Sequence, residues 1–102
     1  MRPHGPVRRP GPLVDQLLRH RTLRGVSLIG CVTGAGMGSD LAHAHWRKER
    51  YRGWICLASL KHLNRTTLTH ELAHLVLGSD AHGEAWKRMV RQLGGRVERR
   101  YV

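Results

Sequence analysis

The sequence predicts a small α+β domain in which helices pack against a short antiparallel or mixed sheet. Two apolar runs, 41–46 and 53–58, lie on either side of a charged turn, which is typical of a strand hairpin. Two later segments, 68–77 and 84–93, instead repeat apolar residues at helical spacing. Because a chain of 102 residues can bury one core, we expect all these segments to belong to a single domain.

The N-terminal part of the chain divides into an arm and two further elements. Residues 1–12 hold all four prolines of the sequence among glycines and arginines, so we expect a flexible basic arm without regular structure. The single domain then covers 13–102. Apolar residues at helical spacing predict a first helix over 13–24, and the partly β-branched run 26–32 predicts a strand.

A glycine-rich segment, 33–40, follows this strand and is similar to a phosphate-binding loop only in composition. It lacks the Lys-Ser or Lys-Thr ending of a P-loop, and no helical pattern follows it. We therefore exclude nucleotide binding at this segment and expect a mobile connection.

The helical segment 68–77 contains an H-E-x-x-H motif that runs from His70 to His74. One helical turn separates the two histidines, so both imidazoles project from the same face and can hold one zinc ion. Glu71 lies one residue further round the helix, where its carboxylate can reach a water molecule on that metal without being a ligand. The pattern predicts a zinc site suited to hydrolysis, and the simpler alternative is an ordinary surface or core histidine pair.

A catalytic zinc ion needs a third protein ligand if one position is to stay open to water. After the helix, Gly78-Ser79-Asp80 is a stop signal followed by a capping residue, and His82 arrives at the start of the next helical segment. Because a short loop of this kind can bring His82 to the metal, we predict His82 as the third ligand. The competing candidates are Glu84, Asp80, Cys31 and Cys56.

Other residues carry weaker signals. His43 and His45 share one face of the strand 41–46 and are a candidate second metal pair, although histidines on a half-exposed sheet face are the more ordinary explanation. Trp86 is expected in the core between two helices, and residues 96–102 are expected to form a basic tail with a short extended segment. No pattern identifies a second oxyanion contact; the candidates are Tyr51, His43, His45 and His62.

Composition bears on the partners and surroundings of the protein. The formal net charge of +11 attracts polyanions such as nucleic acid, but the basic residues are scattered along the chain, which also fits an ordinary solvated surface. Two distant cysteines inside apolar runs indicate buried, reduced thiols. No apolar run approaches the length of a membrane span, and the N-terminus lacks a signal-peptide core. We therefore expect a cytoplasmic monomer that does not enter membranes.

The order of these motifs resembles that of the small zincin metallopeptidases of the SprT-like and minigluzincin type. The match lies in the strand Trp54-Ile55-Cys56-Leu57, the helix His70-Glu71-Leu72-Ala73-His74 and the segment His82-Gly83-Glu84-Ala85-Trp86-Lys87. The last of these is similar to the His-Gly-x-x-Trp/Phe-Lys/Arg signature of that family. The specific part of the resemblance is confined to residues 54–89.

This resemblance implies a zincin-like fold, a zinc cofactor and a metalloendopeptidase that hydrolyses protein or peptide substrates. In the family, the histidine of the second signature is the third zinc ligand, which corresponds to His82, and the glutamate of the first motif, here Glu71, is the general base. The edge strand, here 41–46, runs along the cleft and can align a substrate by β-augmentation. Two alternatives stay open: a metal-dependent endoribonuclease with a three-histidine zinc site, and a non-catalytic binding module in which zinc ties two helices together.

Overall fold

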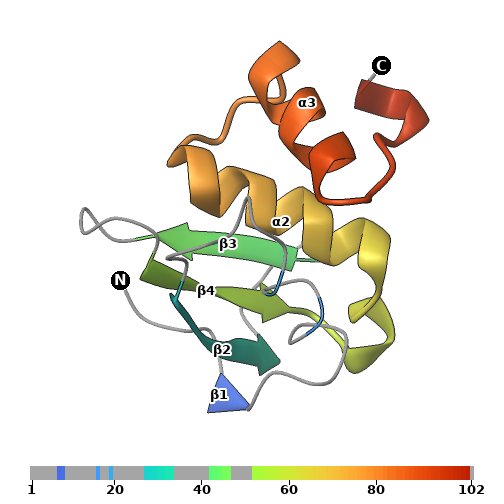
Figure 1. Cartoon of the computed structure of the whole chain (residues 1–102). Helices are drawn as coiled ribbons and strands as arrows, with labels where there is room; N and C mark the ends of the chain where they lie inside the picture. The colour runs from blue at the N-terminus through green and yellow to red at the C-terminus, as the bar shows by residue number, and fades with distance from the viewer. Residues whose placement is uncertain are drawn as a thin grey trace.

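The computed structural model describes residues 7–8, 16, 19, 27–33, 42–46 and 52–101, and these form a small α+β fold (Figure 1). Helix α2 covers one face of a four-stranded sheet, and helix α3 lies on the far side of α2 from the sheet. The predicted α+β class is therefore confirmed. The elements in chain order are β1 (Val7–Arg8), β2 (Ser27–Thr33), β3 (Ala42–Trp46), β4 (Arg52–Leu57), the 3-10 helix η2 (Leu60–His62), α2 (Arg65–Leu77), α3 (Glu84–Gln92) and the 3-10 helix η3 (Arg99–Tyr101).

The sheet is mixed, with the strand order β1-β2-β4-β3. β3 and β4 pair antiparallel as predicted, whereas β2 runs parallel to β4. β3 forms an edge of the sheet, as expected for the strand predicted over 41–46. β1 pairs antiparallel with β2, so the expectation that the arm 1–12 lacks regular structure is wrong at Val7–Arg8. The physical reason is that the outer backbone groups of β2 need hydrogen-bond partners, which this short strand supplies.

Some predicted features lie outside the described residues. They are the first helix over 13–24, of which residues 16 and 19 alone are described, and the glycine-rich connection after Thr33. The turn that contains Tyr51 also lies outside them, and the side chain of Cys31 is not described. The structure therefore leaves these predictions as they stand.

Helix α2 begins three residues before the apolar pattern that predicts it. Asn64 is its N-cap, and the side-chain oxygen of Asn64 accepts a hydrogen bond from the backbone N–H of Thr67 at 2.9 Å, so the helix can begin in a polar stretch. The helix ends at Gly78, which adopts the left-handed conformation with φ 61° and donates its N–H to the carbonyl of His74. No helix among the described residues has both the length and the apolar character needed to cross a membrane.

Helix α2 is buried on two sides, which determines where its polar motif lies. The cluster toward the sheet consists of Ile55, Leu57, Leu68, Leu72 and Leu93. The cluster toward α3 consists of Ala73, Trp86, Val90 and Val97, which confirms the expected core position of Trp86. Because these two sides are apolar, the H-E-x-x-H motif of α2 borders the cleft between β3 and the C-terminal residues.

Gly95 lets the chain after α3 pass directly over α2. A Cβ atom at this position would overlap the hydroxyl of Thr69 and lie 2.5 Å from Thr69 Cβ. Thr69 is fully buried, and its Oγ1 donates a hydrogen bond to the carbonyl of Arg65 at 2.8 Å, so it cannot move away without cost. We expect Gly95→Ala to lower the free energy of unfolding by about 1–3 kcal/mol, as measured by urea denaturation.

Gly83→Ala is the matched control for this substitution. Nothing lies within 4 Å of a Cβ atom at Gly83, so the expected cost is only that of replacing Gly by Ala at the N-cap of α3, about 0.5 kcal/mol of the free energy of unfolding. If Gly95→Ala proved as stable as Gly83→Ala, the close packing of the C-terminal residues on α2 would be contradicted.

Candidate metal centre

Three histidine side chains meet at one point of the structure. The Nε2 atom of His74 lies 3.2 Å from that of His70 and 3.1 Å from that of His82, and the Nε2 atoms of the remaining pair are 3.3 Å apart. Around a tetrahedral zinc ion with Zn–N distances of about 2.0–2.1 Å, the ligand nitrogens lie about 3.3 Å from one another. The three nitrogens therefore have close to the separation that a tetrahedral metal ion requires.

The ring of His74 is oriented so that its Nε2 atom faces this point. Its Nδ1 lies 2.9 Å from the carbonyl oxygen of Ser79, and because a carbonyl oxygen only accepts hydrogen bonds, Nδ1 carries the proton. Nε2 of His74 then carries a lone pair that is directed toward the other two rings. A lone pair on Nε2 is what a metal ion needs, so this tautomer fits metal coordination.

The loop after α2 brings His82 back to the helix. Gly78 reverses the chain direction, and the hydroxyl of Ser79 accepts a hydrogen bond from the backbone N–H of Ala81 at 3.1 Å. α3 begins at Glu84, two residues after His82. The structure thus places His82 beside the two histidines of α2, where the sequence predicted it.

Three of the four competing ligand candidates do not belong to this group. Among the described residues, the group that can hold a metal ion consists of His70, His74 and His82. Asp80 lines the same cleft but is not part of the group. Glu84 is exposed and forms an ion pair with Lys87 at 3.4 Å. Cys56 is buried, as predicted, and packs with Trp54 in a separate cluster.

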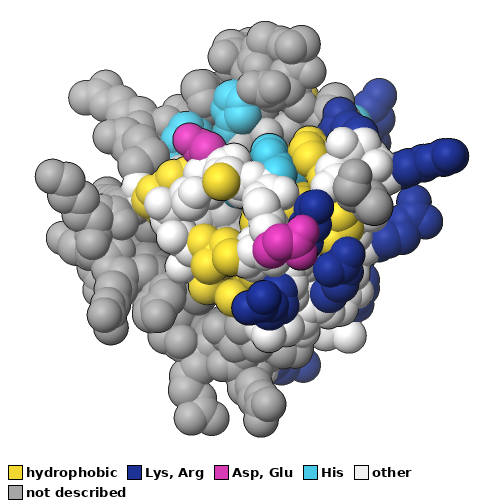
Figure 2. Space-filling view, turned by 90° about the horizontal axis from the view of Figure 1, so that it is seen from above, with side chains coloured by type: hydrophobic (Ala, Val, Ile, Leu, Met, Phe, Trp, Pro, Cys, Tyr) yellow, Lys and Arg dark blue, Asp and Glu magenta, His cyan; other side chains and the backbone are white. Residues whose placement is uncertain are grey.

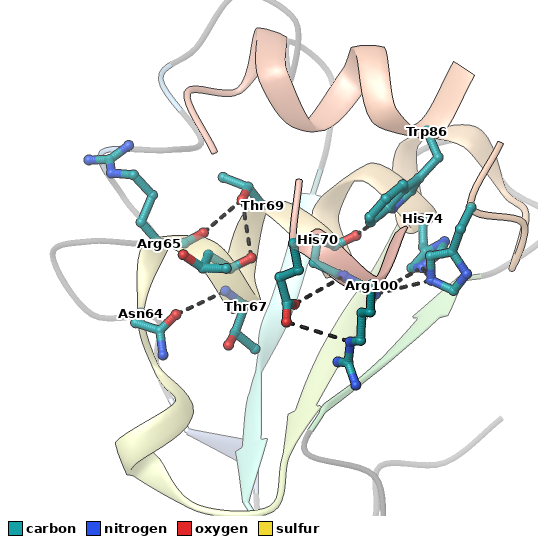
Figure 3. A network of polar contacts seen from close by, with 11 residues as sticks. Asn64, Arg65, Thr67, Thr69, His70, His74, Trp86 and Arg100 are labelled. Carbon is teal, nitrogen blue, oxygen red and sulfur yellow. Dashed lines mark hydrogen bonds and ion pairs between the residues drawn. The ribbon is translucent and has the colours of Figure 1, made fainter. Parts of the chain in front are cut away.

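Trp86 packs against all three imidazoles. Its ring centroid lies 4.7 Å from that of His70, 5.5 Å from that of His74 and 4.7 Å from that of His82. The indole Nε1 donates a hydrogen bond to the backbone carbonyl of His70 at 3.2 Å (Figure 3). Because Trp86 is only 2% exposed, its indole ring is held in place by close packing and limits rotation of the three imidazole rings.

Burial lowers the pKa of each of the three histidines. The pKa of His70 falls from 6.5 to about 4, first because burial removes water and then because His74, His82 and Arg100 place positive charge nearby. Burial also lowers the pKa of His74, against the opposing effect of its hydrogen bond to Ser79, and it lowers the pKa of His82. All three rings are therefore neutral at pH 7, the form in which imidazole binds metal ions.

These pKa shifts make the stability of the metal-free protein depend on pH. A histidine whose pKa is lower in the folded state binds fewer protons when folded, so its stabilising effect is complete above pH 6.5 and is lost as the pH falls toward about 4. At about 1.36 kcal/mol per pKa unit, His70 contributes at most roughly 3 kcal/mol. Urea denaturation across this pH range should show the free energy of unfolding falling as the pH falls. In His70→Gln the free energy of unfolding should fall less over the same range. A stability that is independent of pH in both proteins would contradict the shifts.

The three histidines line a cleft of about 440 Å³ that lies between β3, α2 and the C-terminal residues. All five residues of β3 line this cleft, and since side chains alternate between the two faces of a strand, its backbone must border the cleft as well. Glu71 lines the same cleft and is 6% exposed. The structure therefore brings the predicted general base and the predicted edge strand to the three-histidine group.

His43 and His45 lie outside the three-histidine group. In the register of the sheet they pair with Cys56 and Trp54, and the ring of His45 stacks on that of Trp54 with centroids 5.4 Å apart. Trp54 and Cys56 belong to a different cluster from the one packed on α2, so the two histidine side chains share the sheet face that turns away from α2. His62, another oxyanion candidate, does not line the cleft.

Three residues near the C-terminus line the cleft although no sequence pattern predicts it. They are Glu98, Arg100 and Tyr101. The extended segment predicted within 96–102 does not include Arg99–Tyr101, because these residues form the 3-10 helix η3, in which the N–H of Tyr101 donates to the carbonyl of Glu98 at 2.9 Å. A tyrosine among arginines is the only signal that the sequence offers here, and it does not say what the ring contacts.

No family model, curated protein or solved structure matches this chain. The function is therefore inferred from the chemistry of the site residues. Three neutral imidazoles suit a transition-metal ion such as zinc and leave one tetrahedral position open. The carboxylate of Glu71 belongs to a residue that lines the same cleft.

Proposed function

We propose that this protein is a zinc-dependent endopeptidase with a zincin-like active site of the SprT-like or minigluzincin type. The observation that carries the proposal is the near-tetrahedral spacing of the Nε2 atoms of His70, His74 and His82, with Glu71 in the same cleft. Three protein ligands leave one position of a tetrahedral zinc ion open, which is typical of catalytic rather than structural sites. The neighbouring carboxylate supports hydrolysis as the reaction.

The residues of the cleft divide the chemistry between them. When bound, zinc would lower the pKa of a water molecule to about 7 and polarise the carbonyl of the scissile bond. Glu71 accepts the proton of the attacking water as the new C–O bond forms, and it delivers that proton to the leaving amine as the C–N bond breaks. His70, His74 and His82 contribute their Nε2 lone pairs and take no part in the proton transfer.

The edge strand β3 favours the hypothesis that the substrates are protein or peptide chains. Within the described strands, β3 lies at an edge of the sheet and pairs with β4 along one side, so its other side can form backbone hydrogen bonds with an extended peptide. β3 lines the same cleft as the three histidines, so a peptide added there passes the metal site. Unfolded or flexible protein segments fit this mode of binding because they can become extended.

The test is hydrolysis of an unfolded protein substrate by the zinc-loaded protein, with and without DNA. We expect about one zinc ion per chain and cleavage that a chelator removes and added zinc restores. Faster cleavage in the presence of DNA would indicate that the basic surface binds DNA as part of the function. Stoichiometric zinc without cleavage under either condition would reject the peptidase and favour a non-catalytic, zinc-stabilised binding module.

A metal-dependent endoribonuclease is the second candidate, and the surface charge favours it. The formal net charge is +11, and several Lys and Arg side chains of the described residues lie on the face in Figure 2. Exposed arginines after α2 include Arg88, Arg91, Arg96 and Arg99. Such a surface attracts nucleic acid as a partner. RNA cleavage that disappears in His74→Ala, together with no peptide hydrolysis, would favour this candidate over the peptidase.

A further inference from the structure

The residues Glu98–Tyr101, which we name the C-terminal turn, reach the three-histidine group from outside α2 and the loop that follows it. Glu98 Oε1 lies 4.0 Å from Nδ1 of His70, on the opposite side of the ring from the Nε2 atom that faces the other histidines. The second carboxylate oxygen of Glu98 lies 3.6 Å from Nε of Arg100, and Figure 3 shows Arg100 beside His70. The Glu98 carboxylate is thus held between a guanidinium group and a histidine ring.

Tyr101 makes the second contact of the C-terminal turn. Its ring stacks on that of His82 with centroids 4.3 Å apart and an interplanar angle of 23°. The same ring lies 5.2 Å from the rings of both His70 and Trp86. The guanidinium of Arg100 lies 4.9 Å from the centroid of Tyr101, on the ring face. His82 is therefore enclosed by aromatic rings, with Tyr101 stacked on it and Trp86 at its edge.

The position of the C-terminal turn is determined by the core. Val97, directly before it, is buried against Ala73 and Trp86. Gly95 passes close to Thr69 at the start of the H-E-x-x-H segment. The turn is therefore attached to both helices through the residues that precede it, as a support for metal ligands must be.

We propose that Glu98 and Tyr101 are positioning residues of the metal site: Glu98 orients His70 through Nδ1, and Tyr101 fixes the ring of His82 by stacking. The three histidines then have three separate supports, since the carbonyl of Ser79 orients His74. A carboxylate or carbonyl on the second ring nitrogen of a ligand fixes the tautomer and raises the basicity of the coordinating nitrogen. This inference rests on the metal site of the proposed function, and it does not depend on hydrolysis.

The experiment measures zinc affinity by competition with a chromogenic chelator. We expect Glu98→Ala and Tyr101→Ala each to weaken zinc binding by about 10–100-fold. Glu98→Gln keeps an oxygen that can face Nδ1 of His70, which lies 4.0 Å from the carboxylate, and Tyr101→Phe keeps the ring, so both should recover most of the lost affinity. The matched control is Arg99→Ala, which removes an exposed side chain from the same turn and should bind zinc within about twofold of wild type.

Recovery by the conservative variants separates positioning from a general loss of structure. If Glu98→Ala or Tyr101→Ala bound zinc as tightly as Arg99→Ala, the role of that residue would be overturned. If Glu98→Gln or Tyr101→Phe bound zinc as weakly as the corresponding Ala variant, the polar contact with Nδ1 or the stacking would not be the cause, and the proposal would also be wrong. Wild-type protein that binds zinc but cleaves nothing would reject the peptidase and leave these comparisons intact.

Discussion

Replacing Glu71 by Gln is expected to leave zinc bound and to reduce peptide-bond hydrolysis by about 10²–10⁴-fold, the usual contribution of a general acid–base residue. Gln is close to Glu in size, so it should fit the buried position that Glu71 occupies beside the cleft. An amide cannot accept the proton of the attacking water at neutral pH, which removes the proton transfer and keeps the three histidine ligands. Zinc content and cleavage of an unfolded substrate, measured on the same preparation, check both parts.

Glu84→Gln is the matched control for Glu71→Gln. Glu84 is an exposed glutamate of α3 whose carboxylate pairs with Lys87, so its replacement should change neither zinc content nor the rate of hydrolysis. Activity that survives in Glu71→Gln would refute the general-base assignment. Loss of zinc from Glu71→Gln would instead show that Glu71 supports the metal site.

Replacing His82 by Ala is expected to weaken zinc binding by about 10²–10³-fold. The estimate divides a zinc binding free energy of about 10–16 kcal/mol among four coordination positions and converts one share into an affinity. His82 is half-buried in the loop between α2 and α3, so its loss should remove a ligand and spare the core. Chelator competition measures the affinity, and hydrolysis should fall with the bound zinc.

Two further variants show whether this loss is specific to the third ligand. His62→Ala removes a half-buried histidine that does not line the cleft, so zinc affinity should stay within about twofold of wild type. Asp80→Ala removes a competing candidate that lines the cleft, and it should leave most of the affinity. An Asp80→Ala variant as weak as His82→Ala would mean that the ligand set is different.

Helix and strand periodicity account for the parts of the fold that were predictable. In a helix, residues four apart lie on one face, so the spacing of His70 and His74 brings their Nε2 atoms together wherever the helix packs. The alternation of β4 likewise separates Ile55 and Leu57 from Trp54 and Cys56. These features depend on backbone geometry within a few residues, so the spacing of residue types along the sequence is enough to predict them.

Other parts of the fold depended on contacts that no local pattern records. Helix α2 begins at Arg65 because the side chain of Asn64 caps it, a stronger effect than the low helix propensity of the threonines that follow. The parallel pairing of β2 with β4 joins segments that are separated by β3 in the chain, and the antiparallel pairing of β1 with β2 joins the arm to the domain. Such pairings are chosen by which strand edges remain available after the rest of the chain has packed.

The candidate metal centre contains both kinds of feature: some that local patterns predict and some that depend on contacts between distant segments. Residue order was enough to predict the helix that carries His70, Glu71 and His74, and the short loop that returns His82 to them. No sequence pattern predicted that Glu98 and Tyr101 lie beside His70 and His82, where the folded chain places them. Their contacts arise because the residues before them pack against α2 and α3, and packing of this kind depends on complementary shapes between distant segments, which periodicity does not encode.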